Sequence, residues 1–144
     1  MSSKEPVKLR PSELKLAVAG PSVSAGFPSP ADDFKADELS LDELLVKHPQ
    51  ATFFWRVRGN SMVDAYIHDG DILIVDTAVT ARNKNLVIVA INGEYVVKRL
   101  SIGRGGKISF LSENPDFPAI TPGEEESVQI WGVVRHIIKD ADRV

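Results

Sequence analysis

Apolar and polar positions change their pattern near residue 51. From there on, short runs of branched and aromatic residues alternate with turns rich in Gly, Pro, Asn and Asp, which is typical of β-strands. The run at 72–75 is continuously apolar, as expected of a strand buried on both faces. The pattern predicts a compact, mostly antiparallel β-domain with strands at 52–57, 72–75, 86–91, 95–98, 107–111 and 128–139.

The clearest local signal is a hairpin. Asn92 and Gly93, followed by Glu94, separate the apolar strands 86–91 and 95–98. Asn and Gly accept the positive φ angles of a tight hairpin turn more readily than other residues do. We therefore expect these two strands to pair directly.

The first part of the chain reads as an extended arm followed by a short helix. Five prolines within residues 1–38 exclude a long helix or a central strand, although the apolar residues there would let the arm dock along a groove or a sheet edge. Ser40 precedes Asp42 and Glu43, which predicts a capped helix within 39–46. We expect an arm at 1–38 and a β-domain at 39–144.

Composition narrows the function classes. The chain has 144 residues, no cysteine and a net charge of −3, so disulfides and thiolate zinc sites are excluded and little direct DNA binding is expected. The longest apolar run is too short to cross a bilayer, and no apolar signal region follows Met1. We expect a cytoplasmic protein. The three histidines form no ligand set, so neither a metal nor a cofactor is expected.

Ser61 is the first candidate for chemistry, in the sequence Gly59-Asn60-Ser61-Met62. One interpretation is that Ser61 caps a short helix and that Asp64 completes a capping box. The other is that Ser61 is a nucleophile, whose neighbouring backbone N–H groups stabilise an oxyanion. The amides of Asn60 and Ser61 are the candidates for that second role.

Lys98 is the second candidate, in an apolar strand with Val96 and Leu100 on its own face. One interpretation is an edge lysine that extends into solvent. The other is a buried lysine, whose pKa burial lowers until the neutral amine can act as a base. A serine hydroxyl needs such a base at neutral pH. Ser61 and Lys98 are therefore a candidate serine–lysine dyad.

At this point the residues show a family resemblance. The segment Gly-Asn-Ser-Met-Val-Asp-Ala-Tyr-Ile-His-Asp-Gly-Asp at 59–71, with Val-Val-Lys-Arg-Leu at 96–100, resembles the LexA/UmuD family of self-cleaving serine–lysine proteins. Residues 24–33 resemble the cleavage-site region of its UmuD branch, and the similarity covers about residues 20–139. About 24 residues precede the cleavage site, too few for a helix-turn-helix domain, so we expect the UmuD-type branch rather than a repressor.

The resemblance implies a specific activity. The fold would be the curved β-domain of that family, in a homodimer. Ser61 would attack the carbonyl of Ala25, with Lys98 as general base, and the Ala25–Gly26 bond would break. A RecA filament on single-stranded DNA would stimulate cleavage after DNA damage. The shortened dimer would then join a UmuC-type Y-family polymerase in error-prone translesion synthesis.

Three other functions stay open at this level. The chain could be a structural polymerase subunit that does not cleave, or a phage-type repressor or antirepressor that acts through dimerisation. A signal-peptidase-like enzyme, which cuts other chains, would also use a serine–lysine dyad. The built-in cleavage sequence and the lack of a membrane anchor argue against that third function.

Overall fold

The structure is a computed structural model that describes residues 7–8, 15–18, 37–117, 119 and 127–142. The chain divides into two compact units, residues 10–47 on one side and residues 1–9 with 48–144 on the other. None of the helices in the described ranges is long and apolar enough to span a membrane.

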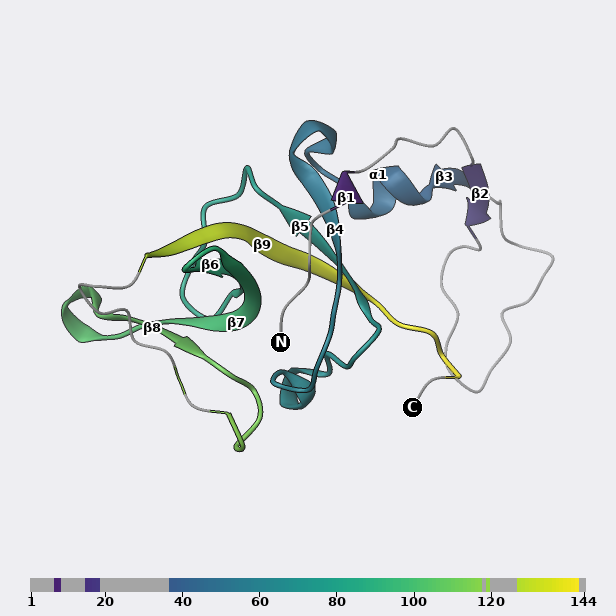
Figure 1. The fold of residues 1–144 in the computed structure, drawn as a ribbon. Helices are drawn as coiled ribbons and strands as arrows, with labels where there is room; N and C mark the ends of the chain where they lie inside the picture. Colours follow the sequence, from purple (N-terminus) through teal and green to yellow (C-terminus); the bar gives the residue numbers. More distant parts are fainter. Residues whose placement is uncertain (1–6, 9–14, 19–36, 118, 120–126, 143–144) are drawn as a thin grey trace. The chain divides into compact units, whose positions relative to one another are not determined.

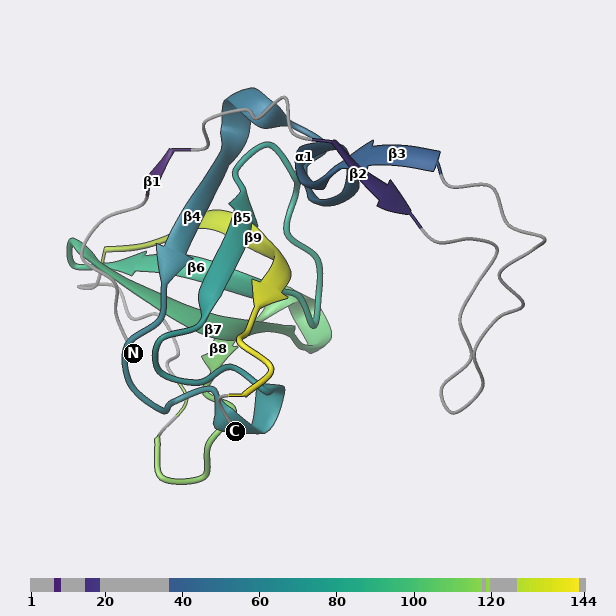
Figure 2. The same ribbon diagram turned by 90° about the vertical axis from the view of Figure 1, so that its right-hand side faces the viewer.

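The larger unit is built on one antiparallel sheet in the order β1-β4-β5-β9-β6-β7-β8 (Figures 1 and 2). The strands are β1 (Val7–Lys8), β4 (Thr52–Arg56), β5 (Ile72–Asp76), β6 (Leu86–Ile91), β7 (Glu94–Ile102), β8 (Ile108–Leu111) and β9 (Val128–Ile138). Three short 3₁₀ turns join them, η2 (Pro49–Ala51), η3 (Val63–Ala65) and η4 (Arg104–Gly106). The predicted mostly antiparallel β-fold is confirmed, and residues 7–8 of the arm do pair at a sheet edge.

The longest strand carries the bend of the sheet. Where β9 pairs with β5, Ile74 lies opposite His136 and Val75 opposite Val134, which leaves Arg135 as an extra residue. Where β9 pairs with β6, the register shifts in the same way and Trp131 is the extra residue. Such bulges bend a strand and increase its twist. The curvature of the sheet therefore follows from two insertions in its central strand.

The predicted hairpin is confirmed. Ile91 of β6 pairs with Glu94 of β7, so Asn92 and Gly93 alone make the turn. Their φ angles are +49° and +83°, the positive values that a two-residue turn with the right-handed twist of the strands requires. The turn fixes the register of β7 against β6, and with it the position of Lys98 opposite Val87.

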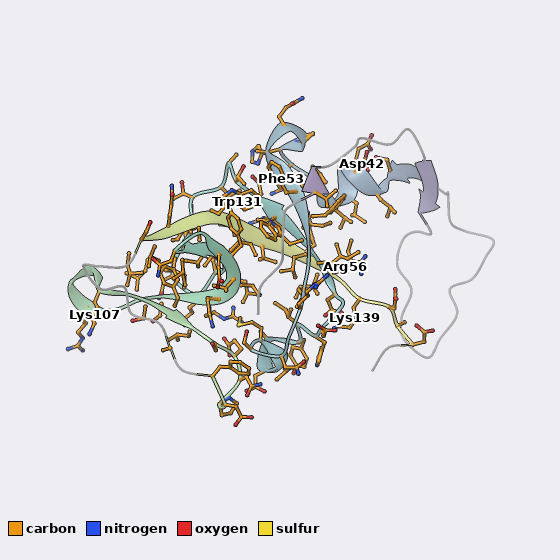
Figure 3. All side chains as sticks on the ribbon, in the orientation of Figure 1. Asp42, Phe53, Arg56, Lys107, Trp131 and Lys139 are labelled. Carbon is orange, nitrogen blue, oxygen red and sulfur yellow. The ribbon has the colours of Figure 1, made fainter. Side chains whose placement is uncertain are left out.

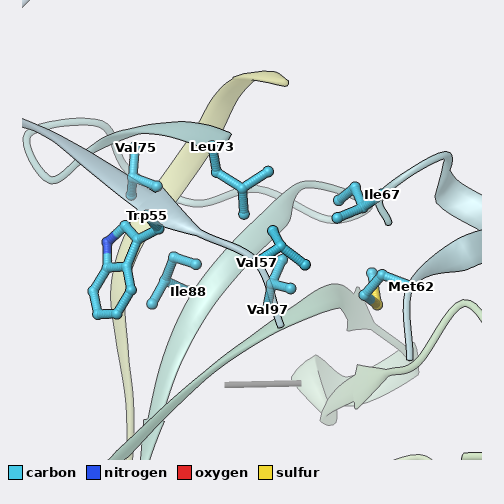
Figure 4. Packing of buried hydrophobic residues seen from close by; sticks show 8 residues of the cluster. All are labelled: Trp55, Val57, Met62, Ile67, Leu73, Val75, Ile88 and Val97. Carbon is cyan, nitrogen blue, oxygen red and sulfur yellow. The ribbon is translucent and has the colours of Figure 1, made fainter. Parts of the chain in front are cut away.

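Alternate residues of β6 and β7 enter two separate apolar clusters. Ile88 and Val97 pack with Trp55, Val57, Met62, Ile67, Leu73 and Val75 in the first cluster (Figure 4). Val87, Val89 and Leu100 pack with Phe110 and Val133 in the second. Because side chains alternate between the two faces of a strand, Lys98 shares the face of the second cluster, whereas Met62 belongs to the first. The sheet is thus buried on both faces around β6 and β7.

Aromatic side chains reinforce the first cluster. Trp131, at the bulge of β9, makes an edge-to-face contact with Phe53, with ring centroids 5.0 Å apart (Figure 3). A second edge-to-face contact joins Trp131 to Trp55, with ring centroids 5.2 Å apart. Tyr95 completes the group, 5.0 Å from Trp55. Such ring pairs stabilise a core by about 0.5–1.5 kcal/mol each beyond the area they bury. Both tryptophans therefore contribute to the core.

The smaller unit contains β2 (Lys15–Val18) and β3 (Asp37–Ser40), which pair antiparallel, and the helix α1 (Leu41–Leu45). The Ser40 side chain accepts a hydrogen bond of 3.0 Å from the Glu43 amide at the start of α1. The predicted capped helix is confirmed. Residues 19–36, which connect β2 to β3 in the sequence, lie outside the described part.

Gly132 of β9 lies where β9 and β5 approach each other closely. A Cβ atom there would lie 2.7 Å from Val75 Cγ1 and 3.2 Å from the Asp76 carbonyl oxygen. Gly132→Ala should therefore destabilise the domain by about 1–3 kcal/mol in urea unfolding. At Gly103 the same substitution meets only the Lys107 carbonyl oxygen at 3.7 Å and serves as the control, with a change within about 0.5 kcal/mol. Equal stability of the two variants would contradict the packing described here.

Candidate active site

Ser61 lies in the loop between β4 and β5. Two backbone hydrogen bonds close the base of this loop, from the Val57 amide to the Asp71 carbonyl and from the Gly70 amide to the Val57 carbonyl, both 2.8 Å long. The Gly59 amide donates to Asp69 Oδ1 at 2.8 Å, and Gly59 itself has a φ of +90°. The loop that presents Ser61 is therefore held at its base and just before the serine.

A buried carboxylate anchors the same loop to the end of β9. Asp71 Oδ2 accepts hydrogen bonds from the His68 amide and from Lys139 Nζ. Burial alone would raise the pKa of Asp71, but the hydrogen bonds and charges of Lys139 and His68 lower it below its ordinary value. Asp71 thus shapes the turn that leads into β5.

The Ser61 hydroxyl is buried without a hydrogen-bond partner. The side chain is fully inaccessible, and none of the described residues bonds to its Oγ. The 3₁₀ turn η3 is capped at Met62, with no side-chain hydrogen bond. The capping interpretation of Ser61 is therefore wrong. Because a buried hydroxyl that lacks a partner is costly, its presence here points to a use other than stability.

Lys98 is also buried, with 5% of its surface exposed. It lies in β7, which β6 and β8 flank on both sides, so the interpretation as an edge lysine is wrong. Lys98 Nζ donates a hydrogen bond of 2.5 Å to Ser112 Oγ. Burial lowers the pKa of Lys98 below its ordinary value of 10.5, because the charged ammonium loses its hydration.

The structure does not join the two predicted residues directly. Among the described residues no hydrogen bond links Ser61 Oγ with Lys98 Nζ, and the amine is bonded to Ser112. Both side chains are nevertheless removed from water in the same unit of the protein. The two candidate residues are thus both buried, and the Ser61 hydroxyl has no partner among the described residues.

A short segment after β8 connects the two sites. The Glu113 amide donates to Met62 Sδ at 3.3 Å, and the Glu113 carbonyl accepts from the Asp64 amide at 2.6 Å. The Asn114 side chain donates to the Asn60 carbonyl at 2.8 Å. We call residues 112–114 the connecting segment, since its first residue holds Lys98 and the next two hold the Ser61 loop.

An ion pair fixes the connecting segment to β7. Arg99 Nε lies 2.6 Å from Glu113 Oε1, and Arg99 also donates to the Lys84 carbonyl at 2.9 Å. Both members of the pair are partly exposed, so this interaction contributes at most about 1 kcal/mol. The ion pair matters more for position than for stability. Because Arg99 and Glu113 directly follow Lys98 and Ser112 in the sequence, it holds the two backbones together beside the Lys98–Ser112 hydrogen bond.

The other predicted site groups have different outcomes. The backbone amides of Asn60 and Ser61 donate no hydrogen bond to any described residue, so both stay candidates for an oxyanion site. Ala25 and Gly26, the predicted cleavage site, lie outside the described residues. In the part of the chain that the structure describes, no group of three His, Asp or Glu side chains could hold a metal ion.

Sequence reasoning missed the connecting segment. Ser112 follows the predicted strand 107–111 in Ser-Glu-Asn-Pro, which reads as an ordinary polar turn. Nothing in that pattern indicates a contact with residues more than ten positions away. Only the pairing of β7 with β8, with Leu111 opposite Arg99, brings Ser112 to Lys98.

An antiparallel β-domain that buries one serine and one lysine of lowered pKa has the parts of a serine–lysine peptidase. Comparison with known proteins agrees, because residues 17–135 match the family described as Peptidase S24-like. The chain belongs to this family, and it is UmuD-like, as the sequence resemblance indicated.

Individual relatives are similar over most of their length. Protein MucA of Salmonella typhimurium is 48% identical over 116 residues, which cover 79% of this chain and 77% of MucA. Protein ImpA of Shigella flexneri is 41% identical over 114 residues, with the same shares of the two chains. The LexA repressor of Paracidovorax citrulli is 37% identical over 129 residues, which cover 90% of this chain but 56% of the repressor.

The buried amine gives a prediction for stability. The unfolded chain binds more protons than the folded one between the lowered pKa of Lys98 and its ordinary value of 10.5, so Lys98 makes stability rise with pH in that window. Lys98→Met should therefore be more stable than the parent at pH 7, by about 1 kcal/mol in urea unfolding. The difference should shrink as pH rises through the window.

Lys107→Met is the matched control, since Lys107 is exposed in a turn. Its stability should differ from that of the parent by less than about 0.5 kcal/mol at every pH. A Lys98→Met variant that is less stable than the parent at pH 7, with a gap that does not change with pH, would contradict a desolvated amine.

Proposed function

We propose that this protein is a self-cleaving UmuD-like serine peptidase that cuts its own chain between Ala25 and Gly26. The observation that carries the proposal is the pair of buried groups in a domain of the S24 kind. Ser61 has a hydroxyl with no partner in the described part of the chain, and Lys98 has an amine whose pKa burial lowers. The chain also carries the cleavage-site sequence, Ser24-Ala25-Gly26-Phe27.

The chemistry needs the Ser61 hydroxyl, the Lys98 amine and the backbone amides of the Ser61 loop. The neutral Lys98 amine takes the proton of the Ser61 hydroxyl as Ser61 Oγ attacks the carbonyl carbon of Ala25. The amides of Asn60 and Ser61 stabilise the oxyanion that forms. The C–N bond to Gly26 breaks, and the Lys98 ammonium returns the proton to the Gly26 amine. Water then attacks the ester, again with Lys98 as base, and releases Ser61.

Because the substrate belongs to the same chain, the cleavage rate depends on the arm. Alanine and glycine flank the bond, and their small side chains let the backbone approach a buried serine. Tethering gives the bond a high effective concentration at the site. The rate then depends on how often the arm occupies the site, so each molecule has one substrate and cuts once.

The biological setting follows from the resemblance to UmuD-type proteins. A RecA filament on single-stranded DNA stimulates the cleavage after DNA damage, and the shortened homodimer becomes an accessory subunit of a UmuC-type Y-family polymerase in the cytoplasm. The similarity to MucA and ImpA supports this branch of the family over the repressors, because both are covered over 77% of their length and the LexA repressor over 56%.

The burial of Lys98 favours one mode of stimulation. A partner could lower the pKa of the lysine by excluding water, or it could favour the docked arm. Because only 5% of Lys98 is exposed without any partner, little further desolvation is left to gain. The filament therefore acts on the position of the arm and donates no catalytic group.

The first test is cleavage of the purified protein as a function of pH. The active base is the neutral amine, so the rate should rise about tenfold per pH unit and level off above the pKa of Lys98, below 10.5. Mass spectrometry should find one cut, after Ala25. Ser61→Ala and Lys98→Arg should both abolish it, since arginine keeps its proton.

Lys107→Arg serves as the control for the lysine substitution and should cleave like the parent. A cut at another bond, or undiminished cleavage in Ser61→Ala or Lys98→Arg, would sink the proposed mechanism.

The second test is stimulation at neutral pH. Activated RecA, with ATP and single-stranded DNA, should accelerate cleavage at pH 7 by at least tenfold. At a pH where the cleavage rate has reached its plateau, the lysine is already neutral. The acceleration should persist there, because the filament acts on the arm. Acceleration that vanishes at high pH would instead show that RecA changes the protonation of Lys98.

A further inference from the structure

The Lys98 amine has one side-chain partner among the described residues, and that partner is not the proposed nucleophile. Lys98 Nζ lies 2.5 Å from Ser112 Oγ. An amine on a four-carbon chain has many rotamers, so a base that must face one hydroxyl needs something to hold it. Ser112 lies in the connecting segment, which also contacts the Ser61 loop.

We propose that Ser112 is the positioning residue of the reaction, and this inference rests on the proposed function. Its hydroxyl accepts a hydrogen bond from Lys98 Nζ and so fixes the direction of the amine. A neutral amine has two N–H donors and one lone pair. With one N–H bonded to Ser112, the lone pair stays free to take the proton from Ser61.

Four contacts hold the segment that carries this hydroxyl in a fixed position. The Glu113 backbone is bonded on both sides, its amide to Met62 Sδ and its carbonyl to the Asp64 amide. The Glu113 side chain is paired with Arg99, the neighbour of Lys98. Asn114 holds the Asn60 carbonyl, one residue before Ser61. The segment that carries Ser112 is therefore bonded both to Lys98 and to the Ser61 loop.

The charged groups around this contact are paired with each other. Arg99 and Glu113 follow Lys98 and Ser112 in the sequence and form an ion pair at 2.6 Å. Asp64, on η3, is exposed and reaches the segment through its backbone amide. The lowered pKa of Lys98 has burial as its cause. The hydroxyl of Ser112 is thus a neutral acceptor for a desolvated amine.

Removal of the hydroxyl has two separable consequences. Without Ser112 Oγ the amine is no longer aimed, so the plateau rate of cleavage at high pH should fall, by about 10- to 100-fold. The ammonium also loses its acceptor while it stays buried, so the charged form becomes less favourable and the pKa of Lys98 should fall further. The midpoint of the pH–rate profile should therefore move to lower pH.

A purely structural role gives the opposite shift. If Ser112→Ala merely loosened the segment, water would reach Lys98 and its pKa would rise toward 10.5. The plateau rate could fall in both cases, but the midpoint moves down only when a specific acceptor is lost. The direction of the midpoint is therefore the informative readout.

The experiment compares Ser112→Ala, Ser112→Thr and Ser109→Ala with the parent over a range of pH. Ser112→Thr keeps a hydroxyl and should retain the midpoint and most of the plateau rate. Ser109 lies on β8 opposite Ser101, away from Lys98, and its alanine variant should behave like the parent. Faster cleavage in Ser112→Ala would show that Ser112 restrains the base, and a midpoint at higher pH would show a structural role. Either outcome overturns the proposal.

A second measurement does not depend on cleavage. In the Ser61→Ala background, NMR with ¹³C- and ¹⁵N-labelled lysine follows the titration of Lys98, whose signal is assigned by its loss in Lys98→Met. Ser112→Ala should lower this pKa and Ser112→Thr should leave it in place. No shift would overturn the proposal. If the parent itself never cleaves, the proposed function fails, and this titration alone decides whether Ser112 holds Lys98.

Discussion

The burial of the Lys98 side chain, on an inner strand of the sheet, is the constraint on which the site depends. A lysine is rarely buried, because its charge loses hydration and its long side chain loses rotamer freedom. Here the cost is partly offset by an acceptor hydroxyl, and partly avoided because the lowered pKa favours the neutral amine. The sheet must therefore hold Lys98 where water does not reach, and its register does so. Asn92 and Gly93 set β7 against β6, and β8 then covers the other edge.

Ser61 is held in place by other interactions than Lys98. Ser61 is carried by a loop, and backbone hydrogen bonds at its base, the buried Asp71 and the insertion of Met62 into the core hold that loop in place. Met62 and Ile67 lie at one end of the first apolar cluster, with Trp55 at the other (Figure 4). The serine thus enters the interior because its neighbour does, and its hydroxyl arrives there without a partner. The burial of Met62 contributes about 1.5–3 kcal/mol, which offsets the cost of about 1–3 kcal/mol for that hydroxyl.

At both Lys98 and Ser61, stability and function have opposite requirements. An apolar side chain in place of Lys98 and a partner for Ser61 would both favour the folded state, and neither would permit acyl transfer. A partly destabilised site of this kind is characteristic of proteins that spend some stability on chemistry. Under the proposed function, the same features make the arm rather than the active site the natural point of control, since burial already desolvates Lys98.

Much of this protein is determined by the local sequence. The alternation of apolar residues specified the strands, Asn92-Gly93 specified a hairpin, and Ser40 specified a helix start, because each depends on residues a few positions apart. Ser61 and Lys98 could be chosen as candidates from their types and neighbours. The sequence could not decide whether either is buried, since a serine after a turn and a lysine in a strand are usually exposed or capping. Tertiary structure decided the burial of both residues. β8 pairs along β7, so Lys98 is not on an edge strand, and Met62 packs into the first apolar cluster and brings the Ser61 loop with it. Tertiary structure also introduced Ser112, which the chain places fourteen residues from Lys98 and which only strand pairing brings within 2.5 Å.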